Sequence, residues 1–136
     1  MKIAIDTNCL VRMLPKKSEY RCLWDAFVHG KYKLCYTTEI LNEYEEVLSG
    51  YYSKEAAEMV TDTILGVPNT VPVTVYYKWD LITADPDDNK FADCALNAGV
   101  NFIVTNDKHF NVLKNIPFPK VNVLDIDSFK EVITKI

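Results

Sequence analysis

The sequence predicts an α/β fold in which a parallel sheet is covered by helices. Short β-like runs alternate with helical stretches along the chain, and this alternation favours parallel strands joined by crossover helices. A composition of 49% hydrophobic and 25% charged residues is that of an ordinary globular protein. The 136 residues contain no internal repeat, low-complexity stretch or linker. We therefore expect one domain over residues 1–136.

The first half of the chain predicts two strands and three helices. In chain order these are a strand over 2–5, a helix over 18–29, a strand over 32–36, and helices over 38–50 and 53–65. Ser18, Thr38 and Ser53 are the expected starts of the helices, because a hydroxyl at this position accepts a hydrogen bond from a free backbone N–H. Gly30 and Gly50 are expected to end the first two helices.

The second half predicts three more strands. The expected elements are a strand over 71–77, a loop over 83–88, a helix over 88–97, a strand over 101–105, a short helix over 108–114, a strand over 121–124 and a helix from Asp127. Pro72 favours either an edge strand or the start of a strand over a central position, because proline cannot donate to a ladder. Gly99 is expected to close the helix before it.

Composition excludes several classes of protein. Four cysteines lack any Cys-x-x-Cys pair, so we expect reduced, mostly buried thiols and neither a zinc site nor a disulfide scaffold. No apolar run reaches the roughly 18 residues of a membrane helix. The N-terminus meets Asp6 after only three apolar residues, unlike a signal peptide. We expect a cytoplasmic protein with no membrane partner.

The net charge of −4 has the wrong sign for a protein that binds nucleic acid through an excess of Lys and Arg. The objection weakens if several acids bind metal ions, because bound cations would reverse the local field.

Four acids stand where the predicted fold would bring them together. Asp6 follows the first strand and Asp107 follows the fourth, and we expect these two strands to be central neighbours. Glu43 borders the apolar stripe of its helix, and Asp88 begins the helix that precedes the fourth strand. In such sheets, ligands bind outside the carboxyl ends of the strands. These carboxylates are therefore the candidate site.

Divalent cations would explain why the acids gather. Like charges about 4 Å apart repel by about 1–4 kcal/mol per pair. Magnesium prefers a few carboxylates together with waters and phosphate oxygens. Two such ions about 3.5–4 Å apart can activate a water and stabilise the leaving oxygen of a phosphodiester. The acids therefore predict a metal-dependent phosphodiesterase.

Some of the acids could instead serve the structure alone. Asp88 could simply cap its helix, in which case Asp85 would replace it as a ligand. The remaining acids near these motifs are expected on a solvated helix face or as loop and cap residues: Glu45, Glu46, Asp125 and Asp127.

Four runs of residues carry a resemblance to a known family. They are Ile5-Asp6-Thr7-Asn8, Ile40-Leu41-Asn42-Glu43-Tyr44-Glu45-Glu46-Val47-Leu48, Asp85-Pro86-Asp87-Asp88-Asn89-Lys90-Phe91 and Ile103-Val104-Thr105-Asn106-Asp107-Lys108-His109-Phe110. In this order they resemble the signatures of PIN-domain nucleases, and more narrowly the branch described as toxin components of bacterial toxin–antitoxin systems. The resemblance covers nearly the whole chain.

The resemblance implies a three-layer α/β/α, Rossmann-like fold and an Mg²⁺- or Mn²⁺-dependent endoribonuclease. It implies that the metal-binding, catalytic acids are Asp6, Glu43, Asp88 and Asp107. Asn8 and Thr105 resemble groups that orient ligands or water. Asp93 stands where many members of the family carry no acid, and we expect it to be an accessory residue of the site.

Basic and aromatic residues near the motifs suggest contacts with RNA. Arg12, Lys90 and Lys108 are expected either to meet phosphates or to be surface charges. His109 is expected to be exposed and passive. Three aromatic residues are expected either to stack on bases or to belong to the core: Tyr36, Phe91 and Phe110.

Two other functions remain open at this point. One is a PIN-like module without turnover that binds RNA or a partner protein; the other is a small-molecule phosphoesterase, although no Gly-rich phosphate loop follows the first strand. The family makes an antitoxin or a homodimer a plausible partner. One apolar helix face either forms the surface for such a partner or packs against the core: Met59, Val60, Ile64 and Leu65.

Overall fold

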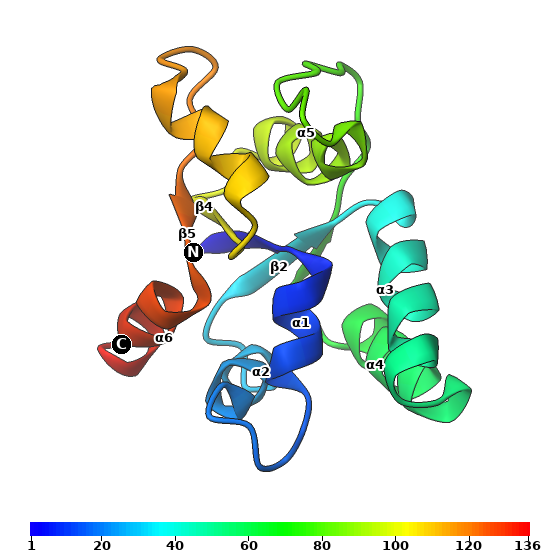
Figure 1. Ribbon diagram of the computed structural model, residues 1–136. Coiled ribbons are helices and arrows are strands. Elements are labelled where there is room, and N and C mark those ends of the chain that lie inside the picture. Colours follow the sequence, from blue (N-terminus) through cyan, green and yellow to red (C-terminus); the bar gives the residue numbers. More distant parts are fainter.

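A five-stranded parallel sheet runs through the middle of the molecule (Figure 1), in a computed structural model that describes residues 1–136. The strands lie in the order β3-β2-β1-β4-β5. Their bounds are β1 Lys2–Ile5, β2 Lys33–Tyr36, β3 Thr70–Pro72, β4 Phe102–Val104 and β5 Val123–Leu124. The central strand β1 pairs on one side with β2 and on the other with β4, where Ile5 lies opposite Val104. The predicted neighbourhood of the first and fourth strands is confirmed.

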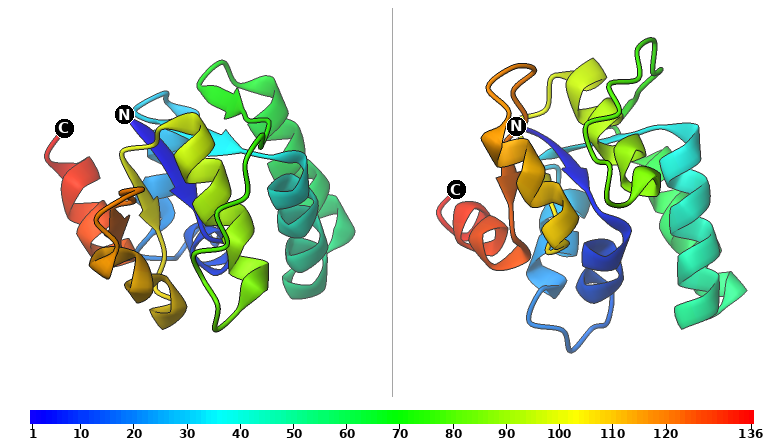
Figure 2. Two further views of the ribbon diagram at one scale, coloured as in Figure 1. Left: turned by 90° about the horizontal axis from the view of Figure 1, so that it is seen from above. Right: turned by 45° about the horizontal axis from the view of Figure 1, so that its top comes forward.

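Six α-helices cover the sheet. They are α1 Thr7–Met13, α2 Arg21–Val28, α3 Thr38–Tyr51, α4 Lys54–Gly66, α5 Asn89–Ala98 and α6 Ile126–Thr134. Two 3₁₀ segments, η1 Pro86–Asp88 and η2 Lys108–Asn115, precede α5 and follow β4. Helix α5 lies on one face of the sheet, while α2 and α6 lie together on the other (Figures 1 and 2). The predicted α/β/α architecture is confirmed.

One apolar core joins these layers. The 35 buried hydrophobic residues form one contiguous cluster that takes side chains from every helix and from the central strands. On the α2 and α6 face, the Tyr32 ring contacts Phe27 and Phe129 with centroids 5.9 and 5.2 Å apart. All four cysteines are free and three are buried, as expected. None of the helices has both the length and the apolar character needed to cross a membrane.

Helix boundaries differ from the prediction where local polar contacts decide them. Helix α1 is absent from the prediction; it begins directly after Asp6 and buries most of its residues. Ser18 does not cap α2, because its hydroxyl accepts from the N–H of Tyr20 in a turn before the helix starts. Thr37, one residue earlier than expected, caps α3. Asp125 caps α6, so that helix begins before Asp127.

The predicted strand over 71–77 is too long. Strand β3 ends at Pro72 and lies at an edge of the sheet, which is one of the placements that this proline favours. The chain then runs beside α5, as the view from above in Figure 2 shows. Side chains of α5 replace a strand partner: Asn97 accepts from the N–H of Tyr76 at 3.2 Å, and Asp93 accepts from the N–H of Trp79 at 2.9 Å. Backbone groups satisfied in this way need no sheet ladder.

We predict that Thr37→Ala lowers the free energy of unfolding by about 1 kcal/mol, because the buried Thr37 hydroxyl accepts from the N–H of Ile40. Thr38→Ala is the matched control, since the exposed Thr38 has no such bond and should change stability by less than about 0.5 kcal/mol. Urea denaturation measures both values. A larger loss for Thr38→Ala would contradict this assignment of the cap.

Candidate metal-binding site

The carboxyl ends of β1 and β4 lie side by side and carry two of the predicted acids. The N–H of Asp6 donates to the carbonyl of Val104 at 2.9 Å, which extends the pairing by one residue. The Thr105 hydroxyl then donates to Asp6 Oδ2 at 2.8 Å and accepts from the N–H of Asp107 at 3.0 Å. The Thr105 side chain thus links the Asp6 carboxylate to the backbone of Asp107. This placement agrees with the positioning role expected for Thr105.

Asp6 is buried and does not cap the helix that it precedes. It occupies the N-cap position of α1, yet its side chain makes no capping hydrogen bond. Burial raises the pKa of Asp6 above its ordinary value, and the negative charges of Asp107 and Glu43 raise it further, while the hydrogen bond from Thr105 opposes the shift. The carboxylate is therefore costly to ionise without a nearby cation.

Glu43 reaches the same place from α3 and is held by two partners. The Thr7 hydroxyl donates to one of its oxygens, and the Lys90 ammonium lies 2.7 Å from the other. Lys90 also lies 2.9 Å from Asp87, and only 7% of its side chain is exposed. Burial alone would lower the pKa of Lys90, but the hydrogen bonds to Glu43 and Asp87 raise it overall. Lys90 is therefore paired within the protein, and its contact with phosphates stays a prediction.

Asp88 carries a buried oxygen without a hydrogen-bond partner. It precedes α5 but makes no capping bond, so it is not simply a helix cap. Its Oδ2 atom is buried and unpaired. Burial, followed by the charges of Asp107, Asp85 and Asp6, raises the pKa of Asp88 to about 6. Asp85, the alternative ligand, does cap, because it accepts from the N–H of Asp87 at 3.2 Å.

His109 is exposed, as expected, and it lies among these acids. Its Nδ1 atom lies 3.3 Å from Asp107 Oδ1, 3.4 Å from Asp88 Oδ2 and 3.9 Å from Asp85 Oδ2. Asp107 places it by accepting from the His109 N–H at 2.9 Å at the start of η2. The sequence held a signal for this placement, because His109 stands only two residues after Asp107. Thr7, which contacts Glu43 and stands directly after Asp6, was likewise not predicted as a site residue.

Two of the other predicted residues share a cavity with the acids. Asn8 and Arg12 line a space of about 180 Å³ together with Asp6 and Asp107. Arg12 is exposed, and its guanidinium lies 4.9 Å from the centre of the Tyr20 ring.

Lys108 and Asp93 lie outside this cavity. Lys108 is exposed and lines a different space of about 310 Å³ beyond Asp107. Asp93 is buried on α5, where it accepts from the Trp79 N–H. Burial raises its pKa, and the charges that act on it are those of Asp80, Lys78 and Glu39. Asp93 therefore holds the segment beside α5 and is not gathered with the four acids.

Burial and hydrogen bonds decide the roles of the other acids and of the aromatic residues near the motifs. Glu45 and Glu46 are exposed, as expected for a solvated helix face. Asp125 caps α6, and Asp127 accepts from the Tyr20 hydroxyl at 2.7 Å. Base stacking is wrong for the three candidate aromatic residues, which are all buried in the core: Tyr36, Phe91 and Phe110.

The residues fit a divalent cation. Oxygen atoms from four separate elements converge at one edge of the sheet, and hard cations prefer such ligands. The orphaned oxygen of Asp88 and the raised pKa values of Asp6 and Asp88 have one physical reason in common, which is negative charge held without enough compensation. A bound cation would supply that compensation.

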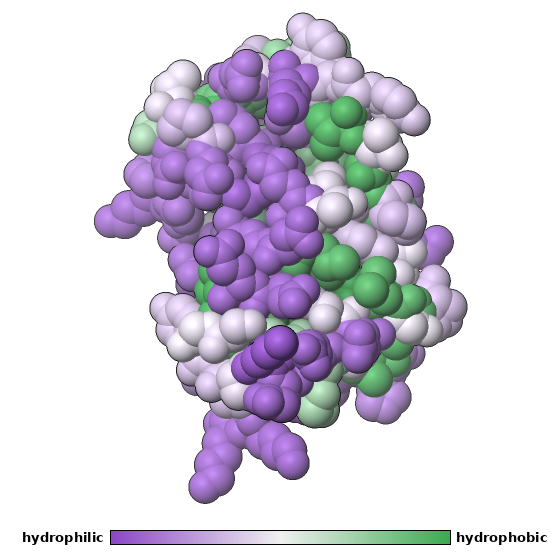
Figure 3. Space-filling view, turned by 90° about the vertical axis from the view of Figure 1, so that its right-hand side faces the viewer, coloured by the Kyte–Doolittle hydropathy of each residue, from purple (hydrophilic) through white to green (hydrophobic).

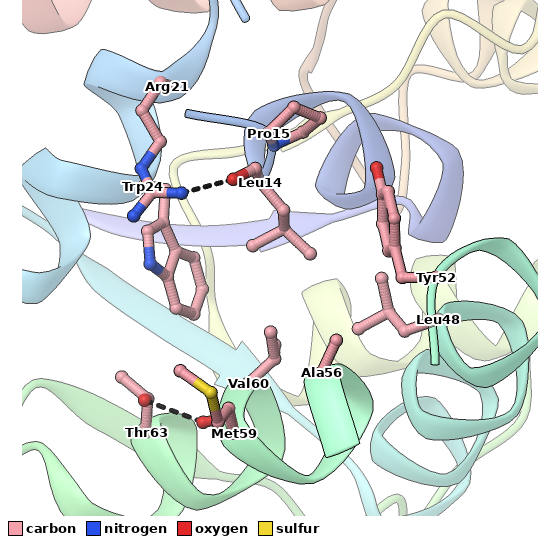
Figure 4. Close-up of a pocket in the computed structure, with 10 residues that line it drawn as sticks. All are labelled: Leu14, Pro15, Arg21, Trp24, Leu48, Tyr52, Ala56, Met59, Val60 and Thr63. Atoms are coloured by element: carbon pink, nitrogen blue, oxygen red, sulfur yellow. Dashed lines mark hydrogen bonds between the residues drawn. The ribbon is translucent and has the colours of Figure 1, made fainter. Parts of the chain in front are cut away.

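A second feature is an apolar groove that is lined by residues of α3 and α4 and contains none of the four acids. Met59 and Leu65 are 72% and 59% exposed, whereas Val60 and Ile64 are buried, so the predicted apolar face divides between surface and core. Figure 4 shows Met59 and Val60 across from Trp24 and Leu14, where they line a cavity of about 270 Å³. Figure 3 shows hydrophobic surface beside hydrophilic surface on the side that carries α3 and α4.

We predict that Lys90→Met lowers the free energy of unfolding by about 2 kcal/mol, because it leaves the part-buried Glu43 carboxylate without its cation. Asp87→Asn is the control: it removes the other partner of Lys90, but Asp87 is exposed and should contribute little. Urea denaturation compares the two. Equal losses of unfolding free energy would mean that the Lys90–Glu43 contact stabilises the protein no more than the Lys90–Asp87 contact does.

Comparisons with known proteins agree with this fold. The sequence matches the model of the PIN domain family over residues 2–109, and no curated protein sequence matches it. VapBC2 from Rickettsia felis, bound to a DNA fragment from their promoter, is similar with a TM-score of 0.63 and 18% identity over 92% of this chain and 98% of that chain.

FitAB bound to an IR36 DNA fragment is similar with a TM-score of 0.58 and 13% identity over 91% of this chain and 94% of that chain. At these identities the two structures support the fold alone. The family match spans most of the chain, including all four acids, and PIN domains are in general nuclease domains. This protein therefore belongs to the PIN domain family.

Proposed function

We propose that this protein is a divalent-metal-dependent endoribonuclease that hydrolyses RNA phosphodiester bonds in the cytoplasm. Asp6, Glu43, Asp88 and Asp107 would hold Mg²⁺ or Mn²⁺. The observation that carries the proposal is the convergence of these acids, in which Asp88 leaves a buried oxygen unpaired. A structural role would instead pair each buried carboxylate with a donor.

The chain's own residues would position the reactants. Thr105 fixes the Asp6 carboxylate relative to the backbone of Asp107, and Thr7 and Lys90 fix Glu43. Ligands held from behind in this way keep one geometry during the reaction. When bound, a divalent cation would activate water, stabilise charge on the phosphate and relieve the repulsion between the acids.

Substrate binding would use the cavity beside the acids. Arg12 and Asn8 line it with Asp6 and Asp107, so a phosphate held there would meet a guanidinium on one side and the metal site on the other. Lys108 lies farther out and would contact a neighbouring phosphate of the RNA. Few cations surround the site, so the bound metal would provide much of the attraction for the backbone.

We predict that Asp6→Asn removes at least about 99% of metal-dependent RNA cleavage, since loss of a catalytic metal ligand costs several kcal/mol of transition-state stabilisation. The fold should persist, because the Asn carbonyl can still accept from Thr105. Without metal its melting temperature should equal or exceed that of the native protein, because a buried charge is gone. With Mg²⁺ or Mn²⁺ the melting temperature should rise only in the native protein.

Labelled single-stranded and structured RNA, incubated with Mg²⁺, Mn²⁺ or EDTA, measures the cleavage. Glu45→Gln is the control, since it removes an exposed acid from the same α3 helix as Glu43. Full cleavage by a folded Asp6→Asn protein would contradict the role of Asp6. A native protein that binds metal and RNA without cleaving would indicate a silent module, and cleavage of small phosphate esters alone would indicate a phosphoesterase.

We further propose that the protein is the toxin component of a toxin–antitoxin pair and that the apolar groove over α4 is a protein interface. Met59, which is exposed and lines the groove, and Leu65, which is exposed on the same helix, support this, because exposed apolar side chains are typical of interfaces. The related structures named VapBC2 and FitAB support a partner protein in general. A homodimer would bury the same side chains.

We predict that light scattering gives the mass of two chains for the native protein and of one chain for a Met59→Lys/Leu65→Lys variant, because two buried lysines would disfavour the interface. Lys substitutions at the exposed Glu45 and Glu46 positions of α3 provide a control for added charge. A native monomer at high concentration would exclude the homodimer and leave the groove to an antitoxin.

A further inference from the structure

We propose that His109 is a nitrogen ligand of the metal site, acting together with Asp85 and Asp88, and that it shifts the preference of the site from Mg²⁺ toward Co²⁺, Zn²⁺ and Mn²⁺. The inference rests on the proposed metal-dependent function and names a residue and a selectivity that the four acids do not supply.

The distances around His109 suit a shared ion. One ligand atom each from Asp85, Asp88 and His109 lies within 4.8 Å of the other two. The Nδ1 atom of His109 is 3.4 Å from Asp88 Oδ2 and 3.9 Å from Asp85 Oδ2. Two ligands that each lie about 2.1 Å from one ion are about 3 Å apart at right angles and about 4 Å apart when opposite. These side chains therefore need only small shifts to meet one cation.

Asp88 Oδ2 and His109 Nδ1, which lie 3.4 Å apart, are the two atoms that a shared cation would join. Asp88 Oδ2 is buried without a hydrogen-bond partner. The His109 Nδ1 atom faces only carboxylate oxygens, those of Asp85, Asp88 and Asp107. A neutral imidazole presents a lone pair on one ring nitrogen, and this lone pair binds metal.

The ring is held by its backbone, as a ligand should be. Asp107 accepts from the His109 N–H at 2.9 Å and starts η2 there, so the position of the imidazole follows from that of Asp107. Next along the chain, Phe110 is fully buried and packs on Phe91 of α5 with ring centroids 6.4 Å apart. This contact anchors η2 against the helix that Asp88 precedes. Packing in the core therefore brings His109 close to Asp85 and Asp88.

A nitrogen ligand has a consequence for metal selectivity. Mg²⁺ takes oxygen ligands almost exclusively and keeps several waters, whereas imidazole suits later first-row cations. Affinity for a mixed nitrogen and oxygen site rises from Mn²⁺ to Co²⁺ in the general order of these ions. A site of carboxylates alone would discriminate less. His109 should thus contribute to Co²⁺, Zn²⁺ and Mn²⁺ binding and little to Mg²⁺ binding.

The chain offers a matched control, since it contains only two histidines. His29 is exposed at the end of α2, and its Nδ1 atom lies 2.7 Å from the Asp25 carbonyl. Calorimetric titration with Co²⁺, Mn²⁺ and Mg²⁺ would compare the native protein with His109→Gln and His29→Gln. NMR of the two imidazoles during Mn²⁺ addition provides an independent readout, because a paramagnetic ion broadens most strongly the resonances nearest to it.

We predict that His109→Gln weakens Co²⁺ binding at least about tenfold and Mg²⁺ binding less than about threefold, while His29→Gln changes neither. In the native protein, Mn²⁺ should broaden the His109 resonances first and leave those of His29 sharp. Equal losses for Co²⁺ and Mg²⁺, or an unbroadened His109, would overturn the proposal. Tighter binding of every metal by His109→Gln would also overturn it, since the imidazole would then be a competing cation.

Failure of the metal site and failure of the His109 ligand give different results. If the native protein binds no divalent metal by calorimetry, the proposed metal-dependent nuclease and the His109 ligand fall together. If the native protein binds metal and cleaves RNA but His109→Gln keeps the native order of metal affinities, only the role of His109 falls.

Discussion

The parallel pairing of β1 with β4 is the constraint on which the site depends. It places Asp6 beside Thr105, whose hydroxyl donates to the Asp6 carboxylate and accepts from the backbone of Asp107. Parallel strands end at the same edge of a sheet, so acids that follow two neighbouring strands must meet. The pairing therefore creates a concentration of negative charge that the rest of the fold has to accommodate.

The fold accommodates this charge unevenly. Glu43 receives a buried lysine and a threonine hydroxyl, and its charge is compensated within the protein. Asp6 has one hydrogen-bond donor, and Asp88 has an oxygen with none. The raised pKa values of these two residues follow mainly from burial, with their acidic neighbours adding to it. The uncompensated part of the cluster is where a cation has most to contribute.

Capping differs among the acids that precede helices. Asp85 and Asp125 each accept a hydrogen bond from a nearby backbone N–H through Oδ1, and in Asp85 this leaves Oδ2 on the side of His109. Asp6 and Asp88 occupy equivalent positions before α1 and α5 but make no such bond. Asp6 is nevertheless buried, and Asp88 keeps a buried oxygen atom without a hydrogen-bond partner. Such residues are good candidates for ligand binding in other folds as well.

The amino-acid sequence by itself determined the α/β class and the order of the strands along the chain, because these follow from hydrophobic periodicity. Motifs of adjacent residues also identified the four acids as the candidate site. Pro72 correctly argued against a central position for its strand. The sequence did not reveal that residues 73–82 leave the sheet, because the side chains that hold them belong to α5, which comes later in the chain.

Only the tertiary structure decided which charged side chains are paired within the protein and which are exposed to solvent. Lys90 and Lys108 have the same charge and lie in similar motifs, yet Lys90 is buried against Glu43 while Lys108 is exposed. His109 joins Asp85 and Asp88 across more than 20 positions of sequence because Phe110 packs on Phe91. Burial and pairing depend on residues distant in the chain, and local pattern carries no information about such contacts.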